Sequence, residues 1–365
     1  AFHWRNWHTR KPDELRTFLE RELHGAASKL AERHHPIAAM IERAVGVFSE
    51  DSALPETVLA ELVDWLANQR FETPSDRLLL RERFDAFLNK FESRDIGQHR
   101  TPESICDLVT GLLDPQAGER MYDPCCGSGG FLIAACDQLR EKREARFSRN
   151  GEAEIQVSGR DINAEACLIA TARMVLTGTT NIRLDSGNSL EQEPVAEPAR
   201  KGFDVIPCNP PWGMRIPRVG RQHFPVPTDD ATGLFVQHIL AQLKPDGRAA
   251  IVVPQGFLYQ KSRLGDVRRW LFKQHRLEAV VALPEGAFQP YTGIKAAVLL
   301  LRRDGGGTRR VRMVEASTYF EKGRGKTTRL SAGNLQNLLE EVKAQKPGKQ
   351  GWDLDVEQIR KLDFD

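Results

Sequence analysis

The sequence predicts an α/β fold preceded by an all-helical domain. Up to about residue 95, apolar residues recur at three- and four-residue spacing, the period of a helix with one buried face. From about residue 119, short β-rich runs alternate with segments long enough to form helices. Alternation of this kind predicts a parallel sheet whose ligand site lies at the carboxyl ends of the strands.

The size and charge of the chain limit its function. Its 365 residues suffice for roughly two domains. The 52 Lys and Arg residues nearly balance 50 Asp and Glu residues, and the net charge of +2 excludes a polycationic nucleic-acid binder while permitting a locally basic groove. No apolar run approaches the roughly 18 residues of a membrane span. None of the six cysteines has the C-x-x-C spacing of a zinc site, so we expect free thiols and a cytoplasmic protein without a metal.

The helical domain is expected to span residues 1–95. Each of its candidate helices opens with Pro or Ser, as helix starts tend to do. In the third candidate, Val58, Leu62 and Leu66 belong to one apolar stripe, which we interpret as core. The candidate helices are Pro12–Leu23, Pro36–Phe48, Pro55–Asn68 and Ser75–Phe91.

The α/β domain is expected to span residues 96–304. Its candidate strands are Arg120–Tyr122, Glu154–Gly159, Ile182–Leu184, Phe203–Ile206, Ala249–Val253, Leu277–Ala282 and Ala296–Leu301. Its candidate helices are Phe131–Arg143, Glu165–Leu176, Leu234–Leu243 and Arg263–His275. Residues 305–365 are expected to form a partner-docking C-terminal extension, with a helix near Ala332–Lys343 and a flexible linker at Lys346–Gly351.

A glycine-rich turn lies between the first expected strand and helix of the α/β domain. It has the sequence D-P-C-C-G-S-G-G-F, in which Gly127, Gly129 and Gly130 let the backbone pass close beneath a ligand. The spacing differs from the G-x-G-x-x-G of dinucleotide sites. Asp123 at the strand end indicates instead a cationic ligand group, such as the amino group of S-adenosylmethionine. Asp161 should end the next strand, where a carboxylate can accept both hydroxyls of a ribose.

The most specific motif is an Asn-Pro-Pro-Trp segment, which follows the strand expected at Phe203–Ile206. Pro210 and Pro211 have no N–H, so the polar groups that face a site here are mainly acceptors. The Asn209 side-chain oxygen and a neighbouring main-chain carbonyl can together accept both hydrogens of an exocyclic amino group. The nitrogen lone pair then faces a methyl donor, and no general base is needed before attack. Trp212 offers a flat surface on which an extruded base can stack, so these four residues form the candidate catalytic segment.

These motifs, together with the T-P-E of Thr101–Glu103, resemble the amino-group DNA methyltransferases. More narrowly, they resemble the modification subunit of type I restriction–modification systems. The resemblance runs from about Ile96 to Arg302. It implies a Rossmann-like S-adenosylmethionine-dependent methyltransferase sheet, with S-adenosylmethionine as the cofactor and the N6 amino group of adenine in DNA as the methyl acceptor.

The resemblance also implies roles for individual residues. Phe288 would form a second face for the flipped base, in addition to Trp212. Two departures from the family pattern can weaken cofactor binding: His99 and Arg100 replace the usual aromatic residues, and Asn188 stands where many members have an acid. The cofactor-binding residues implied are Gln98, Thr101, Pro102, Asp123, Gly127, Ser128, Gly129, Gly130, Asp161 and Asn188.

DNA contact is expected from local basic surface. Arg215, Arg218 and Arg221 follow the catalytic segment in a Gly/Pro-rich loop that can close over double-stranded DNA. No stretch of about 100 residues remains for a sequence-reading domain, so the resemblance implies a separate specificity subunit, with a restriction subunit as a further partner. The alternatives left open are a stand-alone adenine-N6 DNA methylase, a protein-glutamine N5 methyltransferase, an RNA guanine methylase and a non-catalytic assembly subunit. The intact Asn209 segment argues against the last of these.

Overall fold

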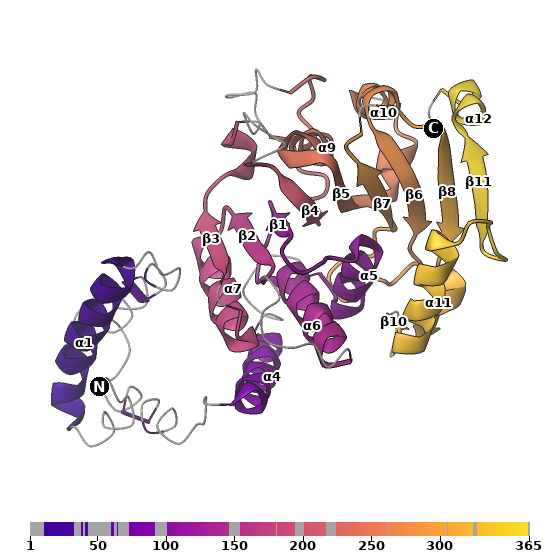
Figure 1. The fold of residues 1–365 in the computed structure, drawn as a ribbon. Helices are drawn as coiled ribbons and strands as arrows, with labels where there is room; N and C mark the ends of the chain where they lie inside the picture. Colours follow the sequence, from indigo (N-terminus) through magenta and orange to yellow (C-terminus); the bar gives the residue numbers. More distant parts are fainter. Residues whose placement is uncertain are drawn as a thin grey trace. The chain divides into compact units, whose positions relative to one another are not determined.

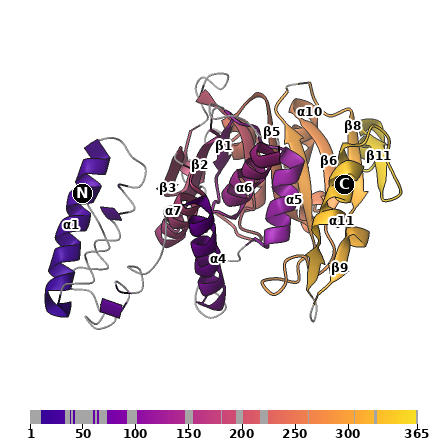
Figure 2. The ribbon, with the colours of Figure 1, turned by 60° about the horizontal axis from the view of Figure 1, so that its bottom comes forward.

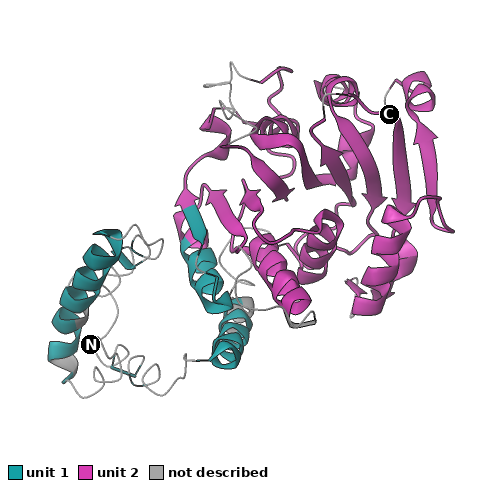
Figure 3. Ribbon diagram, in the orientation of Figure 1, with its two compact units in different colours: residues 1–96, 168–184 teal, residues 97–167, 185–365 magenta. Residues whose placement is uncertain are grey.

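The chain folds into two compact units, each described here by itself (Figure 3). Unit 1 comprises residues 1–96 and 168–184, and unit 2 comprises residues 97–167 and 185–365. The structure, a computed structural model, describes residues 11–32, 38, 41–42, 60–61, 64, 73–91, 101–145, 154–179, 181–193, 201–216, 224–261, 263–304, 306–323 and 327–363.

Two long helices form the main described part of the N-terminal segment. They are α1 (Pro12–Glu32) and α4 (Pro74–Phe91), which correspond to the first and fourth expected helices. The start of α4 is capped reciprocally: the N–H of Asp76 donates to Thr73 Oγ1, and the N–H of Thr73 donates to Asp76 Oδ2, both at 3.1 Å. The second and third expected helices lie almost entirely outside the described residues.

Nine strands of the described residues form one sheet (Figure 1). Their order is β11-β8-β6-β7-β5-β4-β1-β2-β3. The strands are β1 (Arg120–Asp123), β2 (Gln156–Asp161), β3 (Ile182–Ser186), β4 (Phe203–Cys208), β5 (Leu243–Pro254), β6 (Arg276–Ala282), β7 (Ala296–Arg302), β8 (Arg310–Glu315) and β11 (Gly351–Asp355). Neighbouring strands pair in parallel from β2 through β1 and β4 to β5, whereas β7 runs antiparallel to both β5 and β6. The predicted α/β sheet is confirmed, but the antiparallel direction of β7 was not expected.

Helices cover both faces of the sheet in unit 2, as the two views in Figures 1 and 2 show. α5 (Glu103–Leu113), α6 (Gly130–Ala145) and α11 (Ala332–Lys343) lie on one face, where α5 contacts both of the others. α9 (Ala231–Gln242) and α10 (Arg263–Gln274) contact each other on the opposite face. No described helix of either unit is long and apolar enough to cross a membrane.

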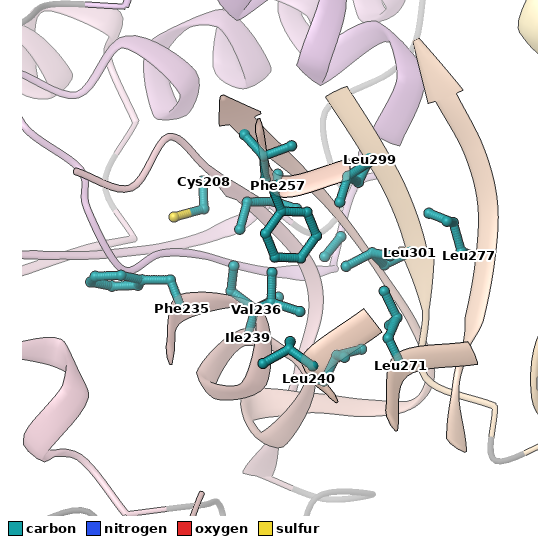
Figure 4. Close-up of a cluster of buried hydrophobic side chains, with 14 of the residues drawn as sticks. Cys208, Phe235, Val236, Ile239, Leu240, Phe257, Leu271, Leu277, Leu299 and Leu301 are labelled. Atoms are coloured by element: carbon teal, nitrogen blue, oxygen red, sulfur yellow. The ribbon is translucent and has the colours of Figure 1, made fainter. Parts of the chain in front are cut away.

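The core of unit 2 depends on strands that are buried on both faces. On β5, Ala249, Ile251 and Val253 belong to a buried apolar cluster with residues of α9 and α10. Figure 4 shows this cluster, with Ile239 of α9 and Leu271 of α10 among its labelled members. Ala250 and Val252 are equally buried but point to the other face, because successive side chains of a strand alternate. That face is covered by α5, which contacts β5. Two-sided burial explains why the second half of this strand, Ala249–Val253, is a continuous apolar run in the sequence.

Residues 305–365, expected as a C-terminal extension with a helix, contain that helix as α11 and also contribute two strands to the sheet. β8 pairs in parallel with β6 and β11 pairs antiparallel with β8, so this segment completes the sheet. Arg312 Nε donates to Asp353 Oδ1 at 2.6 Å between the two strands. In the expected flexible linker, the N–H of Gly348 donates to Glu341 Oε1 at 2.8 Å. Charged residues of this segment therefore form an ion pair within the sheet and a hydrogen bond that joins the expected linker to α11.

Smaller elements complete unit 2. β9 and β10 form a separate antiparallel hairpin that follows β8. Their bounds and those of the short helices are β9 (Phe320–Lys322), β10 (Thr328–Leu330), η3 (Ser189–Glu191), η4 (Gln255–Leu258), η5 (Ser317–Tyr319) and α12 (Val356–Lys361). α7 (Ala164–Thr177) continues from unit 2 into unit 1.

Candidate active site

Three polar side chains lie at the carboxyl ends of neighbouring parallel strands. Asp123 ends β1, Asp161 ends β2, and Asn209 directly follows β4. β1 lies between β2 and β4, where the order of the strands reverses. In open α/β sheets, ligands bind outside the carboxyl ends of the strands at such a switch point. The fold therefore offers a candidate site at this edge.

The glycine loop connects β1 to α6 through a backbone that only glycine adopts readily. Gly127 and Gly129 have φ angles of +49° and +83°, in the left-handed region. The N–H of Gly129 closes the turn by donating to the carbonyl of Cys126 at 2.7 Å. A Cβ at Gly130 would lie 2.9 Å from Cys106 Sγ, so this position also requires glycine for close packing. Cys106 and the other five cysteines all lie in the described part of the chain, where none forms a disulfide.

Asp123 is a buried carboxyl with one unpartnered oxygen. Its side chain is 1% exposed; Oδ1 accepts the N–H of Cys125 at 3.0 Å, while buried Oδ2 has no partner. Burial is the largest cause that raises the pKa of Asp123 from 3.8 to about 8; the hydrogen bond from Cys125 lowers it, and the charge of Asp161 raises it. A cationic amino group beside Oδ2 would satisfy this oxygen and favour the ionised carboxylate. The geometry thus fits the ligand group inferred from the sequence.

Asp161, at the carboxyl end of β2, organises the glycine loop. Its Oδ2 accepts the N–H of Gly127 and its Oδ1 accepts the N–H of Asn163, both at 2.9 Å. Each carboxylate oxygen retains a second lone pair, and the side chain is half-buried. It can therefore still accept hydroxyl groups of a ribose. The loop contact was missed in the sequence, since Gly127 and Asp161 lie 34 residues apart.

Asn209 is held by a contact that the sequence did not predict. Its Nδ2 donates to Thr101 Oγ1 at 2.9 Å, although the two residues are 108 positions apart. Its Oδ1 is buried and has no partner. Because the amide nitrogen is engaged, the free group of the carboxamide is its oxygen, the acceptor needed for an exocyclic amino group. Thr101 and Pro102, implied by the resemblance to cover a cofactor, are both half-buried just before α5.

The aromatic residues of the candidate base pocket contact each other. The ring centroids of Trp212 and Phe288 lie 4.8 Å apart, with an interplanar angle of 68°. A base sandwiched between parallel rings needs centroids roughly 7 Å apart, twice the contact distance of stacked carbon atoms. In this arrangement the gap is closed, so the pair must separate if a base is to lie between them. Trp212 Nε1 is buried without a partner.

Other residues implied by the resemblance have structural roles in this part of the sheet. Asn188 caps η3, accepting the N–H of Leu190 at 3.1 Å and donating Nδ2 to Glu191 at 3.1 Å. The next residue, Ser189, donates its hydroxyl to the carbonyl of Pro124 at 2.7 Å and so ties η3 to the glycine loop. This last contact was not anticipated.

Of the three predicted DNA-binding arginines, one lies among the described residues. Arg215 is exposed and forms an ion pair with Asp229 at 3.0 Å. Arg218, Arg221 and the predicted cofactor residue Gln98 lie outside the described residues. Ser128, Pro210 and Pro211 occupy the glycine loop and the catalytic segment as expected from their place in the sequence.

Comparison with protein families decides the assignment. The family described as N-6 DNA Methylase matches residues 76–365. The chain belongs to this family. The N-6 DNA methylase match includes the glycine loop and the Asn-Pro-Pro-Trp segment, so the resemblance inferred from the sequence is confirmed. It also includes β8 and β11, in agreement with their place in the sheet.

Curated relatives of this N-6 DNA methylase are longer proteins. The type I restriction enzyme EcoEI methylase subunit of Escherichia coli is 29% identical over 251 residues, which are 68% of this chain and 51% of the relative. The StySPI methylase subunit of Salmonella potsdam is 30% identical over 219 residues, 57% of this chain and 40% of the relative. The chain spans about half or less of the length of these relatives.

Solved structures agree on the fold. A chain from a structural study of complex assembly and conformational transition of the type I R-M system has a TM-score of 0.76 and 26% identity, covering 100% of this chain and 78% of that one. A modification subunit of a putative type I restriction enzyme from Vibrio vulnificus YJ016 has a TM-score of 0.75 and 24% identity, covering 88% and 69%. This N-6 DNA methylase thus shares the fold of S-adenosylmethionine-dependent methyltransferases.

Proposed function

We propose that this chain transfers a methyl group from S-adenosylmethionine to the N6 amino group of adenine in DNA, as the modification subunit of a type I restriction–modification system. The observation that carries the proposal is the buried, unpartnered Oδ1 of Asn209 at the carboxyl end of β4. A buried acceptor without a partner is costly, and a substrate N–H would satisfy it. The N-6 DNA methylase family match supports the choice of an adenine amino group.

The residues of the glycine loop fit the proposed cofactor. Bound S-adenosylmethionine supplies an electrophilic methyl group on a sulfonium centre. The free oxygen of Asp123 would hold its amino group, and Asp161 would accept its ribose hydroxyls. The remaining residues proposed to bind the cofactor are Gln98, Thr101, Pro102, Gly127, Ser128, Gly129, Gly130 and Asn188.

The Asn-Pro-Pro-Trp segment would orient the acceptor. An adenine leaves the duplex and stacks on Trp212, because its amino group is out of reach within the stacked helix. Asn209 Oδ1 and a nearby main-chain carbonyl accept the two amino hydrogens and hold the lone pair toward the methyl group. The N–C bond forms as the bond from methyl carbon to sulfur breaks, and the extra proton then leaves to solvent. Phe288 is the proposed second surface for the base, which requires its contact with Trp212 to open.

DNA and a specificity subunit are the proposed partners, with a restriction subunit as a further one. Arg215, Arg218 and Arg221 are proposed to contact DNA phosphates. Specific protein–DNA interfaces bury on the order of 1,000–2,500 Å² of protein surface, and a chain of net charge +2 has limited electrostatic attraction for DNA by itself. The relatives named as type I restriction enzyme methylase subunits support a multi-subunit assembly.

The deciding experiment is methyl transfer to genomic DNA by the purified chain, followed by nucleoside analysis. It is run with and without the product of the neighbouring gene, which is tested as the specificity subunit. We expect N6-methyladenine, and much more of it when the partner is present. Asn209→Ala should abolish transfer while leaving cofactor binding nearly unchanged. Gln336→Ala, a change to an exposed amide on α11, should alter neither. Methylation at carbon 5 of cytosine would refute the assignment. Robust methylation of one defined sequence by the chain alone would favour the stand-alone enzyme.

A further inference from the structure

The β9–β10 hairpin carries a concentration of positive charge. From residue 320 to residue 330 its sequence has a net charge of +3, against +2 for the entire chain. The charged residues of the segment are the acid Glu321 and the cations Lys322, Arg324, Lys326 and Arg329. Neither the cofactor site nor the Asn-Pro-Pro-Trp segment explains why positive charge is concentrated on this hairpin.

The hairpin is joined to the loop that carries Phe288. The N–H of Thr328 donates to the carbonyl of Gly286 at 3.3 Å. Two residues beyond Gly286, the Phe288 ring packs against Trp212 with centroids 4.8 Å apart. Figures 1 and 2 show the hairpin beside α11, and the loop at Gly286 follows the carboxyl end of β6. The hairpin is therefore connected directly to one wall of the candidate base pocket.

The described cations of the hairpin are available to a ligand. Lys322 and Arg329 are exposed, and neither forms an ion pair with another described residue. The carboxylate of Glu321 instead accepts hydrogen bonds from Ser331 Oγ and Asn334 Nδ2, each at 3.1 Å. In the strand register the two cations belong to adjacent cross-strand pairs, so they lie on opposite faces of the ribbon.

Other basic residues near this edge of the sheet are already engaged. Arg310 and Arg312 of β8 form ion pairs with acids of β11, and Arg312 is largely buried. The hairpin thus differs from β8 in presenting its charge outward. An open hollow is lined by its residues, including Lys322, Thr328 and Arg329.

We propose that the β9–β10 hairpin binds the phosphate backbone of DNA beside the base that enters the site, an inference that rests on the proposed function. The DNA major groove is about 12 Å wide and admits a two-stranded ribbon. Its two walls are lines of phosphates. When the ribbon enters the groove with one edge toward the bases, its two faces lie against the two walls, so that Lys322 on one face and Arg329 on the other each meet a line of phosphates. Because the hairpin is bound to the Phe288 loop, this contact would fix the duplex relative to the base pocket.

The test is the salt dependence of DNA binding. Fluorescence anisotropy would follow the full chain as it binds a fluorescein-labelled duplex between about 50 and 200 mM salt. Each phosphate contact contributes about 0.9 to the slope of log affinity against log salt. The double variant Lys322→Gln/Arg329→Gln should therefore lower the slope by about 1.8. Between about 50 and 200 mM salt, the drop in DNA affinity should then be about 12-fold smaller for the variant than for the wild type.

Two further variants control the experiment. Lys273→Gln/Lys361→Gln removes the same charge from exposed positions at the other end of strands β6 and β8, where α10 leads into the start of β6 and α12 follows β11, which is antiparallel to β8. It should leave the slope unchanged. Lys322→Arg/Arg329→Lys keeps the charge and should retain the wild-type slope. Thermal denaturation of each variant checks that the fold is intact.

The outcomes separate this inference from the proposed function. If the wild type methylates adenine but the double Gln variant keeps the wild-type slope, Lys322 and Arg329 do not contact DNA phosphates, and this inference is overturned while the proposed function stands. An equal loss of slope in the Lys273/Lys361 control would likewise overturn the inference, since the effect would then be one of net charge. If the wild type neither binds the duplex nor methylates adenine with its partner present, both proposals fail.

Discussion

Thr101 offers the sharpest test of how the catalytic segment is held. It accepts the hydrogen bond from Asn209 Nδ2 at 2.9 Å, while Asn209 Oδ1 stays buried and unpartnered. Thr101→Val nearly preserves the shape of the side chain but removes the acceptor. The carboxamide can then rotate and present its nitrogen, a donor, where the substrate amino group needs an acceptor. We expect methyl transfer to slow.

The size of the effect follows from one neutral hydrogen bond. Such a bond contributes about 0.5–1.5 kcal/mol net. Since about 1.36 kcal/mol corresponds to a tenfold change in rate, the rate constant for methyl transfer should fall roughly 2- to 13-fold. Single-turnover methylation at saturating S-adenosylmethionine measures this constant directly, under the conditions in which the wild type is active. Calorimetry measures the cofactor Kd of the same variant.

Two matched variants define what Thr101 does. Thr101→Ser keeps the hydroxyl and should retain most of the rate. Thr110→Val deletes a buried hydroxyl of α5 that donates to the carbonyl of Cys106 at 2.8 Å, and should leave the rate near that of the wild type. A weaker cofactor affinity with an unchanged single-turnover rate for Thr101→Val would refute the reasoning. Thr101 would then act on the cofactor, as the resemblance implies, and not on Asn209.

Three further predictions concern the acids and the aromatic wall. Burial raises the pKa of Asp123 from 3.8 to about 8, so between these pH values the folded protein keeps a proton that the unfolded chain releases. This carboxyl therefore destabilises the fold increasingly as the pH rises from about 4 to 8. Asp123→Asn should therefore raise the Tm more at pH 8 than at pH 5, and an equal Tm shift at the two pH values would contradict the pKa argument. Calorimetry should show weaker S-adenosylmethionine binding by this variant. Asp161→Ala should weaken cofactor binding by roughly 1–3 kcal/mol through two lost ribose hydrogen bonds, and unchanged affinity would exclude the ribose contact. Trp212→Ala should weaken binding of DNA that carries 2-aminopurine at the target by roughly 1–3 kcal/mol, the contribution of one base stacked on an aromatic ring. Trp212→Phe should retain most of this binding energy. The fluorescence of 2-aminopurine follows the binding, and equal fluorescence changes in both variants would show that the base does not stack on residue 212.

Local sequence was sufficient where a short segment determines its own conformation. The strand, glycine turn and helix at 120–145 form as predicted, since positive φ angles at Gly127 and Gly129 need no distant partner. The position of Asp123 and Asp161 at strand ends follows from the same local pattern. The strand segments that are buried on both faces were also predictable where they form continuous apolar runs, as at Ala249–Val253.

Pairing along the sheet edge was not predictable in this way. β8 and β11 are short and charged, and what holds them together includes the Arg312–Asp353 ion pair between residues 41 positions apart. The antiparallel direction of β7 likewise depends on which strands its two sides meet, β5 and β6. The apolar periodicity of these segments predicts neither the pairing of β8 with β11 nor the direction of β7.

The sequence alone predicted the chemistry proposed for this protein, and the tertiary structure decided how the residues of the candidate site are held. The Asn-Pro-Pro-Trp motif and the strand-end acids predict an amino-group acceptor and a cofactor with cationic and hydroxyl groups, because residue type sets what a side chain can donate or accept. Only the fold shows that Thr101 fixes Asn209, that Asp161 holds the glycine loop, and that a basic hairpin is bound to the Phe288 loop. These contacts join residues far apart in the chain. They arise from burial and strand order across the whole sheet, which no local pattern encodes.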